Sequence, residues 1–99
     1  MMVIVVMVVD FHLVGCRSLK EKRHRLSGLR DRFGKQSNVA VCESAYPDQH
    51  QLAQWAFVAV GVSRRKVEQT LAAIEQALGS TVDAVITRVD IQDLAGPLG

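Results

Sequence analysis

Cysteine, proline and aromatic residues are scarce in this sequence of 99 residues, and each shortage excludes a class of protein. Two cysteines, Cys16 and Cys42, are too few for a disulfide-stapled scaffold, so we expect a reducing, cytoplasmic environment. With only two prolines and no Gly/Ser-rich tract, nothing indicates a linker or a disordered region. We therefore predict one domain over residues 1–94, followed by a short tail at 95–99.

The sequence also lacks an apolar segment long enough to cross a membrane. Its first apolar run ends at Asp10, well short of the roughly 20 residues that a spanning helix requires. The run has neither the basic residues before it nor the small-residue cleavage pattern after it that mark a signal peptide. We expect no membrane partner.

Residues of the kind that build catalytic or metal sites are sparse. Asp10, His12 and Cys16 form the closest grouping of metal-ligand types, and their spacing matches no closed four-ligand zinc site. The sequence contains no P-loop, no G-x-G-x-x-G fingerprint and no G-x-S-x-G elbow. We predict no metal, no small-molecule cofactor and no catalytic residue, which favours a protein that is not an enzyme.

What the sequence does contain is regular apolar periodicity. It predicts strands over 2–13, 38–45, 52–62 and 82–91, and helices over 18–33 and 63–78. Ser18 with Glu21 forms a capping box at the first helix, and Ser63 can cap the second. This order predicts an α+β fold, the ferredoxin-like β-α-β-β-α-β sandwich. In it, a four-stranded antiparallel sheet of order 4-1-3-2 carries two helices on one face.

Positive charge is concentrated at the starts of both predicted helices. Residues 1–35 hold eight of the twelve Lys and Arg residues against three acids, whereas residues 36–99 hold four against seven. Helix starts favour anions because their N–H groups are unpaired, so two basic helix starts suggest an anionic partner such as RNA. The candidate anion- or RNA-binding residues are Arg17, Lys20, Lys22, Arg23, Arg64, Arg65 and Lys66.

We expect the two basic clusters to meet. The prediction takes the first and third strands as central neighbours that run parallel, so that both helices begin at the same edge of the sheet. Lys22 falls within the apolar stripe of its helix and is expected to extend its ammonium toward that edge. The i,i+4 pairs Glu21–Arg25 and Arg64–Glu68 favour the alternative in which the charges are solvated helix faces.

The second face of the predicted sheet has no helix to cover it. Strand 52–62 is apolar on both sides, with Trp55 and Phe57 on one and Val58 and Val60 on the other. We expect homodimerisation through this face or through an edge strand. The alternative is base stacking on Trp55 and Phe57, because the strand partly matches the third-strand pattern of RNA-recognition modules.

The segments His12-Leu13-Val14-Gly15 and Ser18-Leu19-Lys20-Glu21-Lys22-Arg23 carry a resemblance to a known family. With Asn38–Glu43 on the second strand, they resemble the YlxP-like small bacterial proteins of unknown function over most of residues 1–94. The sequence departs from that family at Val14, where proline is usual, and in the connection over 48–56. The resemblance implies a ferredoxin-like fold and no established activity. Such proteins are often encoded beside translation factors and a ribosome-binding factor, which suggests RNA or the ribosome as a partner.

Three functions follow as alternatives. The first is a non-enzymatic, homodimeric protein that binds structured RNA or the ribosome through its basic edge. The second is a protein-assembly module that uses the apolar sheet face. The third is an acylphosphatase-like hydrolase, because Arg17 and Asn38 stand at places loosely comparable to the Arg and Asn of that fold relative.

Overall fold

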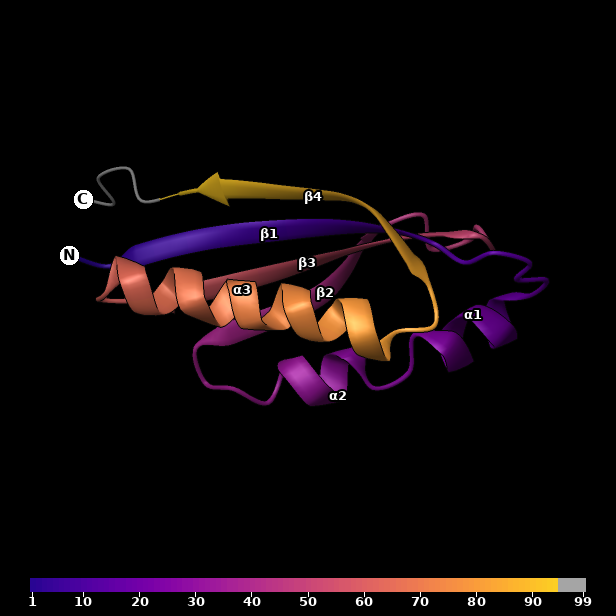
Figure 1. Cartoon of the computed structure of the whole chain (residues 1–99), viewed down its shortest axis with the longest axis horizontal. Helices are drawn as coiled ribbons and strands as arrows, with labels where there is room; N and C mark the ends of the chain where they lie inside the picture. The colour runs from indigo at the N-terminus through magenta and orange to yellow at the C-terminus, as the bar shows by residue number, and fades with distance from the viewer. Residues whose placement is uncertain (95–99) are drawn as a thin grey trace.

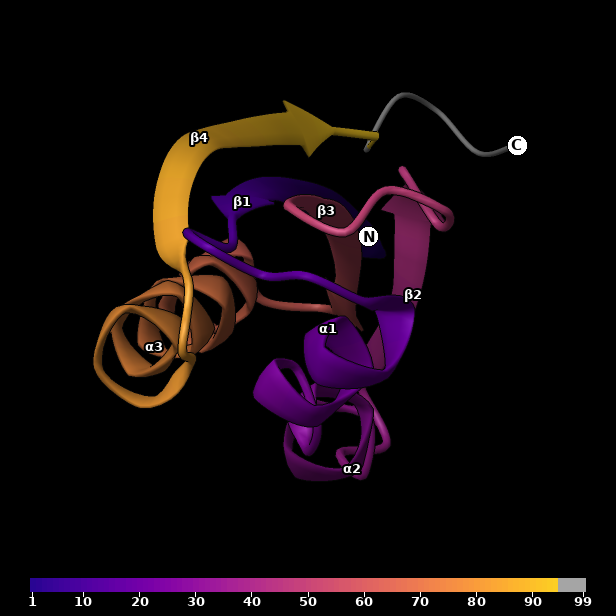
Figure 2. The ribbon, with the colours of Figure 1, turned by 90° about the vertical axis from the view of Figure 1, so that its right-hand side faces the viewer.

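The computed structural model describes residues 1–94. The element order is β1 (Val3–His12), α1 (Leu19–Arg25), α2 (Leu29–Phe33), β2 (Val39–Ala45), β3 (Leu52–Gly61), α3 (Arg64–Thr81) and β4 (Val85–Asp93). The strands form a sheet of order β2-β3-β1-β4 in which every neighbouring pair is antiparallel. The helices lie together on one face of this sheet (Figure 1, Figure 2). The predicted ferredoxin-like fold is confirmed.

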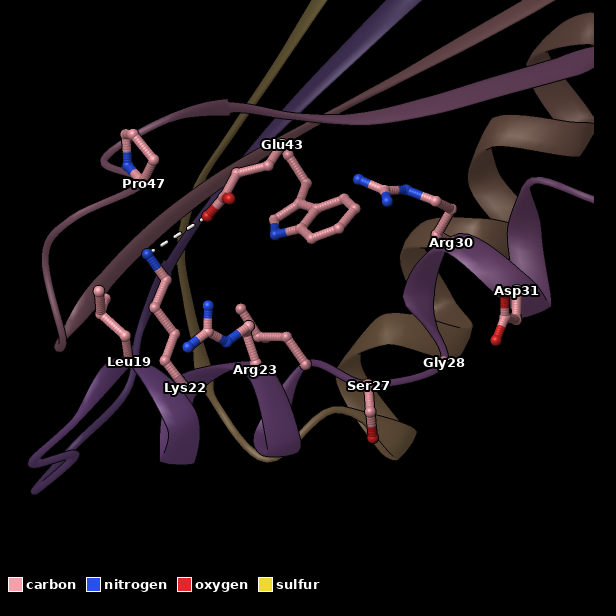
Figure 3. Close-up of a pocket in the computed structure, with 11 residues that line it drawn as sticks. Leu19, Lys22, Arg23, Ser27, Gly28, Arg30, Asp31, Glu43 and Pro47 are labelled. Carbon is pink, nitrogen blue, oxygen red and sulfur yellow. Dashed lines mark ion pairs between the residues drawn. The ribbon is translucent and has the colours of Figure 1, made fainter.

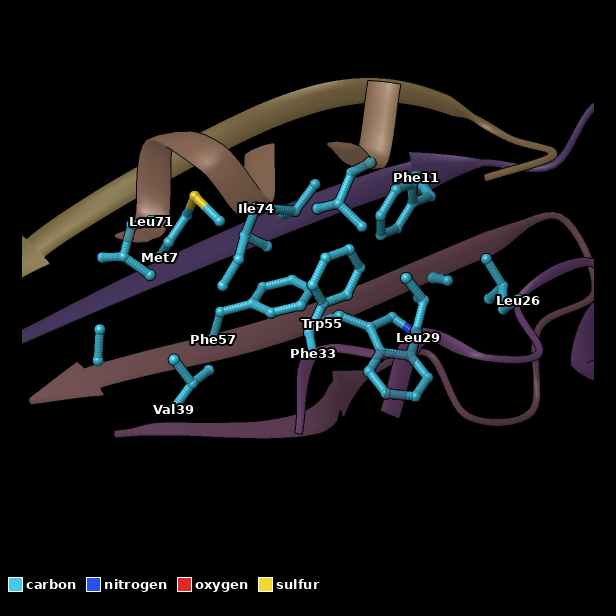
Figure 4. Packing of buried hydrophobic residues seen from close by; sticks show 14 of the residues in the cluster. Met7, Phe11, Leu26, Leu29, Phe33, Val39, Trp55, Phe57, Leu71 and Ile74 are labelled. Carbon is cyan, nitrogen blue, oxygen red and sulfur yellow. The ribbon is translucent and has the colours of Figure 1, made fainter. Parts of the chain in front are cut away.

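The hydrophobic core fills the space between the sheet and the helices. Side chains alternate along β1 and β3, so every second residue faces the helices and is buried. Phe33 of α2 packs edge-on against Phe57 of β3, with ring centroids 6.1 Å apart (Figure 4). Helix α3 contributes Val67, Leu71, Ile74 and Leu78 to the core.

The single helix predicted over 18–33 is instead two short helices. Ser18 caps α1, since its hydroxyl accepts a hydrogen bond from the Glu21 N–H at 3.0 Å. The helix ends at Arg25, and Gly28 adopts a left-handed conformation with φ 89° just before α2 begins. Glycine takes this conformation without the steric cost of a side chain. Leu26, Leu29 and Phe33 are all buried, so the apolar stripe continues across the break that periodicity alone does not reveal.

The second half of the chain follows the prediction with shifted boundaries. Ser63 caps α3 as expected, and its hydroxyl lies 3.4 Å from the Lys66 nitrogen. The helix continues past the predicted end at residue 78 to Thr81, and β4 begins at Val85 rather than at residue 82. The predicted tail, 95–99, lies outside the described residues.

Within residues 1–94, no helix or loop covers the second face of the sheet (Figure 2). Its middle is apolar and partly exposed, and the register places Val6 of β1 beside Val58 of β3. We call this the open face; its apolar residues are Ile4, Val6, Val8, Ala56, Val58 and Val60. Trp55 and Phe57 point the other way and are buried beneath the helices. Neither ring is therefore exposed on the open face for bases to stack on, as that alternative required.

Candidate nucleic-acid interface

The two basic clusters lie at opposite ends of the molecule. Strands β1 and β3 are antiparallel, with His12 paired to Leu52 and Val3 paired to Gly61. The end of β1 therefore lies beside the beginning of β3, and α1 and α3 begin at opposite ends of the sheet (Figure 1). A ten-residue strand separates the two starts by about 30 Å. The predicted convergence into one patch is wrong, because it assumed that the two central strands run parallel.

At the first end, three of the predicted cations are exposed. Arg17 precedes α1, and Lys20 and Arg23 lie on it. None of the three side chains forms an ion pair with another residue among 1–94. Their charge is therefore not neutralised by a neighbouring carboxylate and is available to an anion from outside.

Arg25 of the same helix differs from these three. Its guanidinium pairs with Glu21 at 2.7 Å, as the i,i+4 spacing predicted, and donates a hydrogen bond to the Val14 carbonyl at 2.8 Å. A longer ion pair of 3.8 Å joins it to Asp83. This side chain ties α1 to the end of β1 and to the turn before β4, so its charge is already used within the fold.

Lys22 is buried, with 3% of its surface exposed. Its Nζ donates to the carbonyls of Tyr46 at 2.6 Å and Gln49 at 3.0 Å, and lies 3.2 Å from the Glu43 carboxylate (Figure 3). The ammonium extends toward the sheet edge as predicted, but an ammonium has three donors and protein oxygens surround it. Lys22 therefore fixes α1 to β2 and to the β2–β3 turn, and we leave it out of the interface.

The second cluster stands apart at the start of α3. Arg64 pairs with Asp93 of β4 and not with Glu68, the partner that the helical spacing suggested. Arg65 and Lys66 are exposed and have no ion pair within residues 1–94. Two exposed cations at this end make a smaller positive surface than the one around α1.

Cations that the sequence reasoning did not select lie along α2. Arg30 and Arg32 on α2 and Lys35 just after it are all exposed, which extends the positive surface of α1 along the next helix. Residues 17–35, which we call the basic arm, hold eight basic and two acidic residues. The excess of positive charge in residues 1–35 is evident in the sequence, but helix starts alone do not include Arg30, Arg32 and Lys35.

A cavity of about 440 Å³ lies beneath the basic arm (Figure 3). Both helices of the arm line it, and Glu43, Pro47 and Trp55 close it from the sheet side. The Arg30 guanidinium lies 5.7 Å from the centre of the Trp55 ring, a cation–π distance. The Nε1 of Trp55 is buried and has no hydrogen-bond partner among the described residues.

The structure does not bring together the two residues on which the acylphosphatase-like alternative depends. Arg17 follows the end of β1, whereas the Asn38 carbonyl accepts a hydrogen bond from Val60, beside the beginning of β1. The two residues proposed for acylphosphatase-like chemistry thus lie at opposite ends of the sheet. Cys16 is buried, with its Sγ 3.4 Å from the Ser18 carbonyl. No cluster of His, Cys, Asp and Glu within residues 1–94 could hold a metal ion.

An antiparallel sheet of this order with helices on one face defines a ferredoxin-like α+β domain, and comparisons with solved structures agree. A de novo designed protein with a ferredoxin fold, LFR1 1, matches with a TM-score of 0.55 and 13% identity, over 98% of this chain and 90% of that one. The designed protein Ferredog-Diesel matches with 0.52 and 11%, over 90% and 83%. A C-terminal segment of the alpha subunit of aIF2 from Pyrococcus abyssi matches with 0.54 and 15%, over 91% and 49%. At these identities the similarity shows the fold alone.

The sequence identifies the family. The chain belongs to DUF503, a family of proteins of unknown function, whose model matches residues 4–91. A search of curated proteins finds no match. Among residues 1–94, no helix is both long and apolar enough to cross a membrane.

Proposed function

We propose that this DUF503 protein is not an enzyme and binds structured RNA, free or within the ribosome, through the basic arm. The observation that carries the proposal is the set of exposed cations at the start of the arm, Arg17, Lys20 and Arg23, which lack acidic partners within residues 1–94. Cations of this kind release the counterions condensed on a nucleic acid, which supplies binding energy without reading sequence. Four of the arm's six exposed Lys and Arg residues are arginines, and guanidinium groups suit phosphate oxygens.

The resemblance to YlxP-like proteins supports the same partner. It is strongest over residues 12–23, which include the first cations of the arm. Because such proteins are often encoded beside translation factors, the resemblance favours RNA over other polyanions. A cytoplasmic location forms part of this proposal.

The test is fluorescence anisotropy with a labelled RNA hairpin, from about 50 to 200 mM salt. Each lost phosphate contact lowers the slope of log affinity against log salt by about 0.7–0.9. The double variant Arg17→Gln/Lys20→Gln should therefore lower the slope by about 1.5 and weaken binding at low salt. A matched control, Arg65→Gln/Lys66→Gln, also removes one Arg and one Lys near a helix start, at the other end of the molecule. Equal losses in both variants, or no binding at 50 mM salt, would overturn the proposal.

A second candidate function is assembly of two copies through the open face. The observation that favours it is the block of partly exposed apolar residues along β1 and β3. Polar side chains border this block: Gln54 donates to Asp10 at 2.9 Å and accepts from Ser44 at 2.9 Å. An apolar centre with a polar rim is the usual anatomy of a protein–protein contact. Dimerisation would leave the basic arm, on the opposite side of the sheet, free to bind RNA.

A further inference from the structure

The buried indole of Trp55 has a polar group that the fold does not satisfy. Only 8% of the residue is exposed, and its Nε1 finds no acceptor among residues 1–94. A buried donor without a partner costs about 1–3 kcal/mol, and phenylalanine would offer a similar ring without that cost. Because Trp55 lines the cavity beneath the basic arm, an acceptor from a bound molecule would satisfy this donor.

The cavity is lined by apolar side chains and by charged ones, with the acid Asp31 among the latter. Its volume of about 440 Å³ falls in the range of small-molecule sites, and Leu19, Leu26 and Pro47 supply apolar surface. Lys22 and Glu43 neutralise each other within the lining. Arg23 and Arg30 are exposed and carry no ion pair within residues 1–94, so no carboxylate neutralises either guanidinium, and that of Arg30 lies over the Trp55 ring.

We propose that this cavity binds one unpaired nucleotide of the RNA, an inference that rests on the proposed function. A nucleobase is flat and largely uncharged, and its ring nitrogens and carbonyls accept hydrogen bonds of the kind that the Trp55 N–H lacks. Its phosphate pairs with Arg23 and Arg30. The nucleotide has to be unpaired, because a base within a duplex cannot leave its stack without losing its partner.

Entry of the base requires a side chain to move. The Nε1 of Trp55 is shielded from water, and the Arg30 guanidinium lies over the indole ring. Arg30 is long and exposed, so it can turn from the ring to the phosphate and free that face of the indole. Binding therefore replaces the contact between Arg30 and Trp55 and changes the surroundings of the indole.

Trp55 is the only tryptophan, so intrinsic fluorescence reports on the cavity directly. The first measurement titrates the protein with each of the four ribonucleoside monophosphates and, separately, with inorganic phosphate. We expect a saturable change in emission with at least one nucleotide at millimolar concentration or below, and a much smaller change with phosphate. No change with any nucleotide, or an equal change with phosphate, overturns the inference.

The second measurement uses variants and calorimetry with a short single-stranded RNA. Trp55→Phe keeps an aromatic ring and removes the N–H, and Arg30→Gln removes a phosphate contact without altering the core. Each should weaken single-strand binding at least tenfold, while Arg65→Gln, at the far end of the molecule, should leave it unchanged. If both cavity variants bind the single-stranded RNA with wild-type affinity, the inference is overturned. This holds even if Arg17→Gln/Lys20→Gln still lowers the salt slope for the hairpin. Loss of that slope effect would instead count against the proposed function.

Discussion

Two lysines on α1 have different roles: one holds the fold together, and the other is available for binding. Lys22 is buried among three oxygen partners, whereas Lys20, two positions earlier, is exposed. The burial of the Lys22 side chain could be predicted, because Lys22 falls within the apolar stripe of its helix. The partners could not be, because the carbonyls of Tyr46 and Gln49 lie 24 and 27 residues further along the chain. Only the folded turn brings them to the ammonium.

We predict that Lys22→Met destabilises the protein by about 2–4 kcal/mol. The substitution leaves two carbonyls and the partly buried Glu43 carboxylate without their donor. Urea unfolding followed by circular dichroism measures the change. The control Lys20→Met should stay within about 0.5 kcal/mol of wild type while weakening RNA binding. Equal stability of the two variants would contradict the role given to Lys22.

At the scale of elements, the break between α1 and α2 depends on one backbone conformation. Periodicity predicted a continuous helix because Leu26, Leu29 and Phe33 keep helical spacing and are all buried. Apolar periodicity indicates which residues face the core, but it does not reveal a turn that leaves the same residues buried. Gly28, with φ 89°, marks that turn, and a glycine within an apparently helical segment was the signal available in the sequence.

We predict that Gly28→Ala destabilises the protein by about 1 kcal/mol, since an L side chain in the left-handed region is strained. An added Cβ would contact nothing within 4 Å, so strain and not a clash sets the effect. The matched control is Gly79→Ala in α3, where an added Cβ also meets nothing within 4 Å. Higher helix propensity should stabilise that variant by a few tenths to about 1 kcal/mol. Thermal unfolding of both variants gives the comparison, and a stabilising Gly28→Ala would show that the turn is not needed.

The relative direction of β1 and β3 decides where the two basic clusters lie. Their apolar patterns indicate that β1 and β3 are central, but a side-chain pattern reads the same in either direction along a strand. The antiparallel pairing follows from the connections, and it places the starts of α1 and α3 at opposite ends of the sheet. The predicted antiparallel order already makes the first and third strands antiparallel, so the separation of the clusters follows from the predicted fold, and the assumption of parallel strands was inconsistent with it.

At the scale of the whole molecule, the sheet divides two surfaces with different chemistry. The helix side carries the basic arm, and the other side is the open face (Figure 2). The fold and the existence of this bare face could be predicted, because six elements supply only enough helix to cover one side of a four-stranded sheet. The cavity beneath the arm could not be predicted, since its lining comes from segments 19–31, 43–47 and 55, which are far apart in the sequence.

We predict that the protein is a dimer of 10.9 kDa chains at about 100 μM, and that Val58→Lys makes it monomeric. A charge at the centre of an apolar contact is desolvated without a partner, which opposes association. Light scattering coupled to size exclusion measures the mass, and circular dichroism checks that the variant folds. Gln76→Lys, at an exposed position of α3 on the opposite side of the sheet, is the control and should remain dimeric. A wild-type monomer at this concentration would exclude the open face as a stable dimer contact.

The central claim, that the basic arm is the working surface, is tested most directly by nuclear magnetic resonance. Backbone amide shifts of the ¹⁵N-labelled protein are followed while an RNA hairpin with an unpaired loop is added at about 50 mM salt. The account predicts that the largest shifts fall within residues 17–35, with the Trp55 indole N–H moving among them. Shifts concentrated at the start of α3 or on the open face, with the arm unchanged, would contradict it.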